Sequence, residues 1–149
     1  MPLRVQKHTS HLTKNRFGKP NGFLIPIFNI HDGFIPSEHL PQQVYLTVCE
    51  VGEVKGPHLH RKRRGFFTCI RGDVKIVAKT EDGYEEYFSG EHHEFATIEV
   101  PPGIPSALQN IGDEAAYILN TPSPAWRVDD QDEYEIVFEG YSFSGSEKE

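Results

Sequence analysis

Short apolar runs separated by Gly, Pro, Asn and Asp recur along the chain, and they constrain its fold more than any other feature. Helix signals are almost absent, because few of the runs follow a helical period. A tight hairpin is predicted at residues 81–83 (EDG), since Asp-Gly tolerates the positive φ of such turns. The spacing predicts an all-β fold, either a double-sheet jelly roll or a small barrel. The expected strands span residues 22–29, 43–51, 64–72, 73–80, 84–90, 95–100, 106–111 and 115–121.

The length and composition predict one folded domain over residues 1–149. The chain is long enough for one hydrophobic core and short for two. Charged residues make up 25% and hydrophobic residues 37%, which is typical of a globular protein. Residues 1–15 and 141–149 are polar, and we expect them to be frayed or to serve in contacts between copies.

The charge and the apolar pattern exclude some classes of partner. A net charge of −7 argues against general nucleic-acid binding, although residues 60–64 (HRKRR) would supply a local basic pocket. The start of the chain lacks the apolar core of a signal peptide, and no apolar run approaches membrane-spanning length. Cys49 and Cys69 lie inside expected strands, where buried thiols are the usual interpretation. We therefore expect a cytoplasmic protein with no nucleic-acid or membrane partner.

His58 and His60 are separated by one residue, so an extended segment would place both imidazoles on one face. Such a pair can be two metal ligands, or a base and its partner. The spacing resembles the two motifs of the cupin superfamily. In the first motif Gly52 is followed after five residues by His-x-His, with Gly72 closing it. In the second motif the matching positions are Pro101, Gly103 and Asn110. The resemblance implies a cupin double-stranded β-helix, which is a jelly-roll barrel.

Two departures from the cupin motifs bear on the chemistry. Metal-dependent cupins take a glutamate from the first motif and a third histidine from the second, where this chain has Gly65 and Ser106. Two imidazoles alone make a poor metal site, and His92 and His93 lie in an expected turn. We therefore expect no metal and no other cofactor. A neutral histidine is a good general base for removing a proton next to a carbonyl.

Residues 17–138 resemble the dTDP-4-dehydrorhamnose 3,5-epimerase-like branch of the cupins, through the segments GEH, VPPGI, NIGDEA and DDQDEY. The resemblance implies metal-independent chemistry on a nucleotide-diphosphate sugar. It places His58 at the epimerases' catalytic base and Lys55 at a phosphate-facing arginine. His60 matches the His-x-His of the related dTDP-4-keto-6-deoxyglucose 3,4-ketoisomerases, and Tyr45 resembles the tyrosine of their R-V-Y strand. On this resemblance His60 and Tyr45 are expected to be catalytic together with His58.

The epimerases' catalytic tyrosine falls at Leu119 in this chain. Tyr117, two residues away on the same face, is the expected substitute. On its overall motifs the chain is expected to epimerise a dTDP-linked 4-keto-6-deoxyhexose. The His-x-His pair and the missing tyrosine favour a 3,4-ketoisomerase instead. A third hypothesis is a non-catalytic cupin that binds a sugar nucleotide.

The remaining candidates are groups that suit a nucleotide diphosphate. Diphosphates need cations, which the basic run and Arg127 can supply. The indole of Trp126 can cover the pocket or stack on a base. A carboxylate from residues 129–135 can orient a histidine. A homodimer formed through sheet edges is expected, because an uncovered edge needs protection. The predicted substrate-binding residues are Lys55, Lys62, Arg64, Asn120, Trp126 and Arg127.

Overall fold

The computed structural model describes residues 2–144, which form two five-stranded antiparallel sheets and a separate two-stranded hairpin. Two 3-10 helices, η1 (Ile30–Asp32) and η2 (Ser37–His39), lie between the hairpin and the sheets, and in this part of the chain no helix is long and apolar enough to cross a membrane. The strands are β1 (Val5–Lys7), β2 (His11–Lys14), β3 (Pro20–Leu24), β4 (Tyr45–Cys49), β5 (Val54–Leu59), β6 (Gly65–Arg71), β7 (Asp73–Thr80), β8 (Gly83–Gly90), β9 (Ala96–Val100), β10 (Ser106–Asn110), β11 (Ala116–Asn120) and β12 (Tyr134–Glu135).

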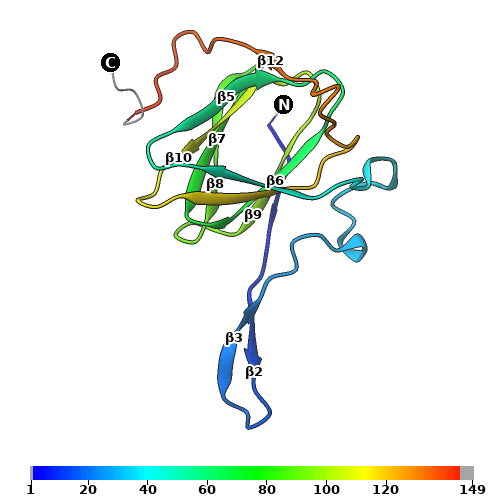
Figure 1. The fold of residues 1–149 in the computed structure, drawn as a ribbon, viewed down its shortest axis with the longest axis vertical. Coiled ribbons are helices and arrows are strands. Elements are labelled where there is room, and N and C mark those ends of the chain that lie inside the picture. The colour runs from blue at the N-terminus through cyan, green and yellow to red at the C-terminus, as the bar shows by residue number, and fades with distance from the viewer. Residues whose placement is uncertain (1, 145–149) are drawn as a thin grey trace.

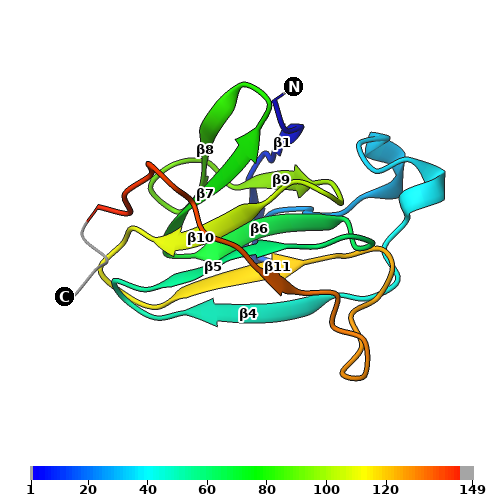
Figure 2. The same ribbon diagram turned by 90° about the horizontal axis from the view of Figure 1, so that it is seen from above.

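The two large sheets face each other and close into a barrel (Figures 1 and 2). One sheet has the strand order β1-β9-β6-β11-β4, and the other has the order β12-β5-β10-β7-β8. Sequential neighbours often lie in different sheets, as in a jelly roll. The predicted all-β cupin fold is confirmed. The expected strand at 22–29 is shorter and lies outside the barrel, because β3 pairs only with β2.

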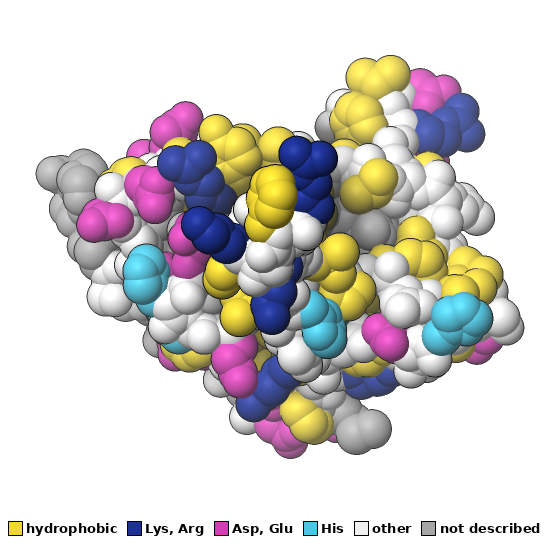
Figure 3. Space-filling view, turned by 90° about the horizontal axis from the view of Figure 1, so that it is seen from below, with side chains coloured by type: hydrophobic (Ala, Val, Ile, Leu, Met, Phe, Trp, Pro, Cys, Tyr) yellow, Lys and Arg dark blue, Asp and Glu magenta, His cyan; other side chains and the backbone are white. Residues whose placement is uncertain are grey.

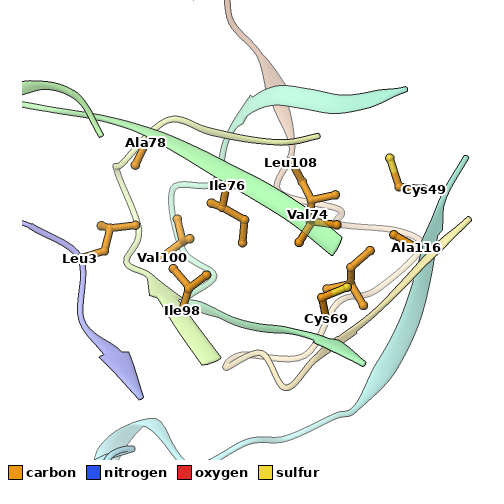
Figure 4. Close-up of a cluster of buried hydrophobic side chains, with 11 residues drawn as sticks. Leu3, Cys49, Cys69, Val74, Ile76, Ala78, Ile98, Val100, Leu108 and Ala116 are labelled. Atoms are coloured by element: carbon orange, nitrogen blue, oxygen red, sulfur yellow. The ribbon is translucent and has the colours of Figure 1, made fainter. Parts of the chain in front are cut away.

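The core lies between the sheets, where alternate side chains of each strand point inward. Figure 4 shows Leu3 beside Ile98 and Val100 of β9 at one end of this core. Cys49 and Cys69 are buried in it as free thiols, as the sequence indicates. Burial raises the pKa of Cys69 to about 12, so this thiol stays neutral.

The N-terminal segment is not frayed, contrary to one of the two expectations for residues 1–15. Strand β1 pairs with β9, so that Val5 lies opposite Ile98, and Leu3 is buried in the core. The following hairpin of β2 and β3 projects away from the barrel (Figure 1).

The C-terminal segment also packs against the barrel where the structure describes it. Tyr141 and Phe143 join Phe138 and Tyr84 in an aromatic cluster on the outer face of the second sheet. The Tyr141 hydroxyl donates a hydrogen bond of 2.6 Å to Glu86. The expected frayed end therefore does not begin at residue 141, and residues 145–149 lie outside the described residues.

Replacing Phe138 by alanine should lower the free energy of unfolding by about 3 kcal/mol, because it empties the centre of this cluster. The neighbouring Val137 is 75% exposed whereas Phe138 is 6% exposed, so Val137→Ala is a matched control. The control should change the free energy by less than about 0.5 kcal/mol. Urea titrations of the wild type and the two variants measure both changes. Equal losses of unfolding free energy in the two variants would mean that Phe138 does not hold the C-terminal segment against the barrel.

Candidate active site

A pocket of about 520 Å³ opens at one end of the barrel, between the two sheets. Strand β4 contributes Tyr45 and Thr47 to it, and β5 contributes Lys55 and His58. Its lining combines apolar side chains with convergent polar and titratable groups, as in a small-molecule site. Its lining is completed by Gln43, Leu46, His60, Arg63, Phe67, Ile76, Ser106, Ala107, Leu108, Trp126 and Glu133.

His58 pairs with Glu133, and this contact defines the chemistry of the pocket. The short strand β12 pairs with β5, which places Glu135 opposite His58 and carries Glu133 to the pocket wall. The Nδ1 atom of His58 lies 2.8 Å from Oε2 of Glu133. A carboxylate at Nδ1 holds the proton on that nitrogen and leaves the Nε2 lone pair free. The acidic run at 129–135 predicted such a carboxylate without identifying Glu133.

His60 lines the same pocket but has a different environment. Its Nδ1 atom lies 2.8 Å from the backbone oxygen of Asp132 and 3.1 Å from Nη2 of Arg63. The carbonyl requires a proton on Nδ1 and the guanidinium requires a lone pair, so only one contact is a hydrogen bond in a given tautomer. Burial, and then the charge of Arg63, lower the pKa of His60 to about 4. His60 is therefore neutral near pH 7.

Asp132 organises the loop between β5 and β6. Its carboxylate accepts backbone N–H bonds from Arg61 at 3.0 Å, Lys62 at 2.9 Å and Arg63 at 2.9 Å. Although burial alone would raise the pKa of Asp132, these hydrogen bonds leave it below its usual value. The backbone of the basic run is thus bound to the acidic segment that follows it much later in the chain.

Three of the predicted cations do not reach the pocket. Lys62, Arg64 and Arg127 are absent from its lining, because each pairs with a carboxylate elsewhere. Lys55 does line the pocket, as predicted, and so does Arg63, another of the cations that the basic run makes available. The ion pairs are Lys62–Asp130 at 3.0 Å, Arg127–Asp129 at 2.8 Å and Arg64–Glu99 at 2.8 Å.

Tyr45 and Trp126 line the pocket, whereas Asn120 lies behind it. Asn120 is completely buried, and its side chain donates a hydrogen bond of 2.8 Å to the hydroxyl oxygen of Tyr45. The backbone N–H of Trp126 donates to Oε1 of Gln43 at 2.8 Å. Asn120 therefore positions a pocket residue and does not itself face a ligand, contrary to its predicted role.

Tyr117 lies on the wrong face of β11 for the role expected of it. The alternate residues of β11 point into the barrel, where Ile118 belongs to the core and Asn120 contacts Tyr45. Tyr117 and Leu119 share the opposite face, as expected, but that face is the outside of the sheet. Leu119 lines a separate apolar groove there. Neither residue is among those that line the histidine pocket.

The other two histidines considered as ligands are bound elsewhere. The Nδ1 atoms of His92 and His93 lie 2.7 Å and 3.2 Å from the carboxylate of Asp73, at the turn between β8 and β9. Ser106 faces His58 across the paired strands β10 and β5. Over residues 2–144, no group of three or more His, Cys, Asp and Glu side chains could hold a metal ion.

The low pKa of His60 predicts a pH dependence of stability. Between pH 6.5 and about 4 the unfolded chain takes up a proton on this imidazole and the native protein does not, so stability falls as the pH falls. His60→Gln should therefore lose less stability than the wild type between pH 7 and pH 4.5. Urea titrations at the two pH values measure the difference. The exposed hairpin variant His11→Gln serves as the control and should follow the wild type.

Several solved structures share this fold. A dTDP sugar isomerase from Desulfovibrio desulfuricans G20 superposes with a TM-score of 0.73 at 13% identity, covering 97% of this chain and 92% of the other. QdtA, a sugar 3,4-ketoisomerase from Thermoanaerobacterium thermosaccharolyticum solved with TDP, gives 0.64 at 19% identity, covering 89% and 86%. ChmJ, a 3'-monoepimerase from Streptomyces bikiniensis solved with dTDP-quinovose, gives 0.70 at 15% identity, covering 91% and 69%.

Sequence comparison assigns the family. No curated protein matches the chain. The family FdtA, described as WxcM-like, C-terminal, matches residues 20–138, which is most of the chain and includes the complete histidine pocket. The protein belongs to this FdtA family of WxcM-like C-terminal domains.

Proposed function

We propose that the protein is an isomerase that moves a proton next to the ketone of a nucleotide-linked 4-keto-6-deoxyhexose. The observation that carries the proposal is the His58–Glu133 pair in a pocket that a second histidine also lines. The structures of similar fold support the same class, since they include a dTDP sugar isomerase, a 3'-monoepimerase and a 3,4-ketoisomerase.

His58 is the proposed base. With Nδ1 bound to Glu133, its Nε2 lone pair can take the proton from C3, the carbon beside the ketone. Glu133 stabilises the imidazolium that forms and keeps the ring oriented. His60 suits this task less well, because its low pKa makes it a weak base.

The geometry favours 3,4-ketoisomerisation over the epimerisation that the overall motifs suggest. Epimerisation needs an acid on the face of the sugar opposite the base, and the expected acid position, Leu119, lies outside the pocket together with Tyr117. Ketoisomerisation returns the proton to the neighbouring carbon, so one histidine can both remove and return it. His60, the residue that matches the ketoisomerases, also lines the pocket.

The pocket offers complementary groups for the rest of a nucleotide sugar. Lys55 is exposed at the pocket and is a point charge for a diphosphate. Arg63 lines the same wall, although its guanidinium is also bound to the backbone oxygen of Gln131 at 2.8 Å. Trp126 is an aromatic surface on which a base can stack. We propose a thymidine diphosphate as the nucleotide, since QdtA was solved with TDP and ChmJ with dTDP-quinovose.

Removing the base should abolish turnover if the pocket is catalytic. We expect His58→Ala to lower kcat on dTDP-4-keto-6-deoxyglucose by about 10²–10⁴-fold, and Glu133→Gln to lower it by about tenfold or more, with KM little changed. Glu135→Gln, in the adjoining strand β12, is a matched control that should retain wild-type kcat. Unchanged turnover in His58→Ala would overturn His58 as the base, whereas no turnover by the wild type would favour the sugar-nucleotide-binding alternative.

Solvent exchange separates the two isomerase reactions. In deuterated buffer the wild-type protein should form a 3-keto product and incorporate deuterium at C3 or C4, because the proposed proton transfer involves only these two carbons. A 3,5-epimerase would also exchange the hydrogen at C5. Proton NMR of the sugar reports each position, and exchange at C5 would overturn the ketoisomerase assignment.

A homodimer is the proposed assembly, with the hairpin of β2 and β3 as the contact between copies. The hairpin forms its own two-stranded sheet and exposes Leu12, Phe17 and Phe23 at 77%, 72% and 60%. A two-stranded hairpin is marginally stable alone in water, and this one projects from the barrel (Figure 1). Figure 3, which looks onto its tip, shows basic and hydrophobic side chains gathered there.

Charge complementarity favours a second copy as the partner of the hairpin. Residues 1–31 contain five Lys or Arg and no Asp or Glu, so the net charge of −7 is divided into +5 here and −12 in the remainder. Over residues 2–144 the barrel also leaves one edge of β4 unpaired, beside an apolar groove of about 440 Å³ lined by Phe28, Val44 and Leu119 among others. An arm with exposed strand edges can pair with such an edge in a second copy.

Charge reversal of the hairpin tip tests this assembly. The triple variant Lys14→Glu/Arg16→Glu/Lys19→Glu should be a monomer at micromolar concentration, whereas the wild type should sediment as a dimer that weakens with salt. Lys79→Glu on the barrel is the control for added negative charge and should remain dimeric. A wild-type monomer, or a triple variant that dimerises normally, would contradict the proposal.

A further inference from the structure

Asp132 has a backbone conformation that no other non-glycine residue among residues 2–144 adopts. Its φ is 53°, in the left-handed region. Side chains adopt this region at a cost, although Asp and Asn tolerate it better than the rest. The residue is 8% exposed and directly precedes Glu133, the partner of His58. A strained residue persists only where its surroundings hold it, and such residues gather at functional sites.

The left-handed turn lets Asp132 hold two neighbouring parts of the site at once. Its backbone oxygen lies 2.8 Å from Nδ1 of His60, which follows the last residue of β5. Its carboxylate accepts hydrogen bonds from three successive backbone N–H groups of the next loop, at Arg61, Lys62 and Arg63. The side chain thus holds the loop, and the carbonyl acts separately on the histidine.

The contacts of His60 determine which ring nitrogen carries its proton. The Asp132 oxygen at 2.8 Å requires a proton on Nδ1, whereas Nη2 of Arg63 at 3.1 Å requires a lone pair there. The guanidinium has another partner, because its Nη1 donates to the backbone oxygen of Gln131 at 2.8 Å. Among the hydrogen bonds of residues 2–144, the Asp132 carbonyl has only His60 as a donor, and a buried carbonyl without a donor is costly. The shorter contact therefore places the proton on Nδ1.

A proton on Nδ1 leaves the lone pair of His60 on Nε2, the ring nitrogen that remains for a ligand in the pocket. Burial and the charge of Arg63 lower the pKa of His60 to about 4, so the ring is neutral near pH 7 and Nε2 accepts a hydrogen bond. On the basis of the isomerase function proposed above, we propose that Asp132 is a positioning residue, which directs the Nε2 lone pair of His60 toward a sugar hydroxyl at or beside C3.

Two imidazoles with the same tautomer then face the substrate. Glu133 holds the proton of His58 on Nδ1, as the Asp132 carbonyl does for His60, and the two ring centroids lie 6.4 Å apart. His58 takes the proton from carbon, and His60 accepts a hydrogen bond from the hydroxyl. A hydroxyl bound in this way fixes C3 in front of the base.

NMR of the imidazole nitrogens measures the tautomer directly. Long-range proton–nitrogen correlation distinguishes a protonated ring nitrogen from one with a lone pair, and the signals that disappear in His60→Gln identify His60. In the wild type at pH 7 we expect the proton on Nδ1, although free histidine favours Nε2. A proton on Nε2 of His60 would overturn the inference.

Two variants of Asp132 separate its carbonyl from its carboxylate. Asp132→Gly and Asp132→Ala both lose the carboxylate, but glycine adopts the left-handed φ freely and alanine adopts it at a cost. Asp132→Ala should therefore hold His60 less well, with kcat on dTDP-4-keto-6-deoxyglucose about tenfold below that of Asp132→Gly. Because both variants release the loop at 61–63 equally, they should bind TDP with the same Kd, which calorimetry measures.

Equal kcat in the two folded variants would contradict the role of the carbonyl. A loss of kcat between them that is matched by a loss of TDP affinity would mean that Asp132 only holds the loop, and would also overturn the inference. If Asp132→Ala does not fold, the wild-type tautomer still decides, together with the Nδ1 proton that Asp132→Gly should keep. Failure of the proposed function is distinguishable, because the wild type would then give no 3-keto product while the tautomer of His60 remains measurable.

Discussion

The pairing of β12 with β5 is the contact on which the candidate site depends. It ties an acidic segment near the end of the chain to the strand that carries the histidines, so that Glu133 meets His58 and the Asp132 backbone meets His60. The Asp132 carboxylate then binds three successive backbone N–H groups of the next loop. The two histidines consequently differ in their partners, although only one residue separates them in the chain. His60 is held neutral and His58 is paired with an anion.

The alternation of strand residues decides which groups can take part in chemistry. Tyr45 and Asn120 lie opposite each other in the paired strands β4 and β11, and both point inward. Tyr117 and Leu119 point outward from the same strand. A chemistry that depends on a tyrosine at position 117 or 119 is thereby excluded from this pocket, whereas one that depends on Tyr45 is accommodated.

The basic side chains fall into two groups, those that form ion pairs away from the pocket and those that line it. Lys62, Arg64 and Arg127 form ion pairs away from the pocket, so of the Lys and Arg side chains in the basic run only Arg63 lines the pocket. Lys55 and Arg63 remain as the pocket cations. The N-terminal hairpin concentrates positive charge and exposed aromatic rings, in contrast to the acidic barrel. The pocket and the hairpin are therefore separate surfaces with different chemistry.

The sequence by itself determined the all-β cupin fold, the His58 and His60 pair, and the loss of the two other metal-ligand positions. These are local properties, because turn residues and the period of two act within a few residues, and a motif is a spacing along one segment. It predicted Tyr45, Lys55 and Trp126 as pocket residues by the same means. Only the tertiary structure decided that Glu133 contacts His58, that Asn120 donates a hydrogen bond to Tyr45, and that Tyr117 faces outward. Those outcomes depend on strand register and on pairing between segments distant in sequence, and a shift of one residue would reverse every side chain of a strand.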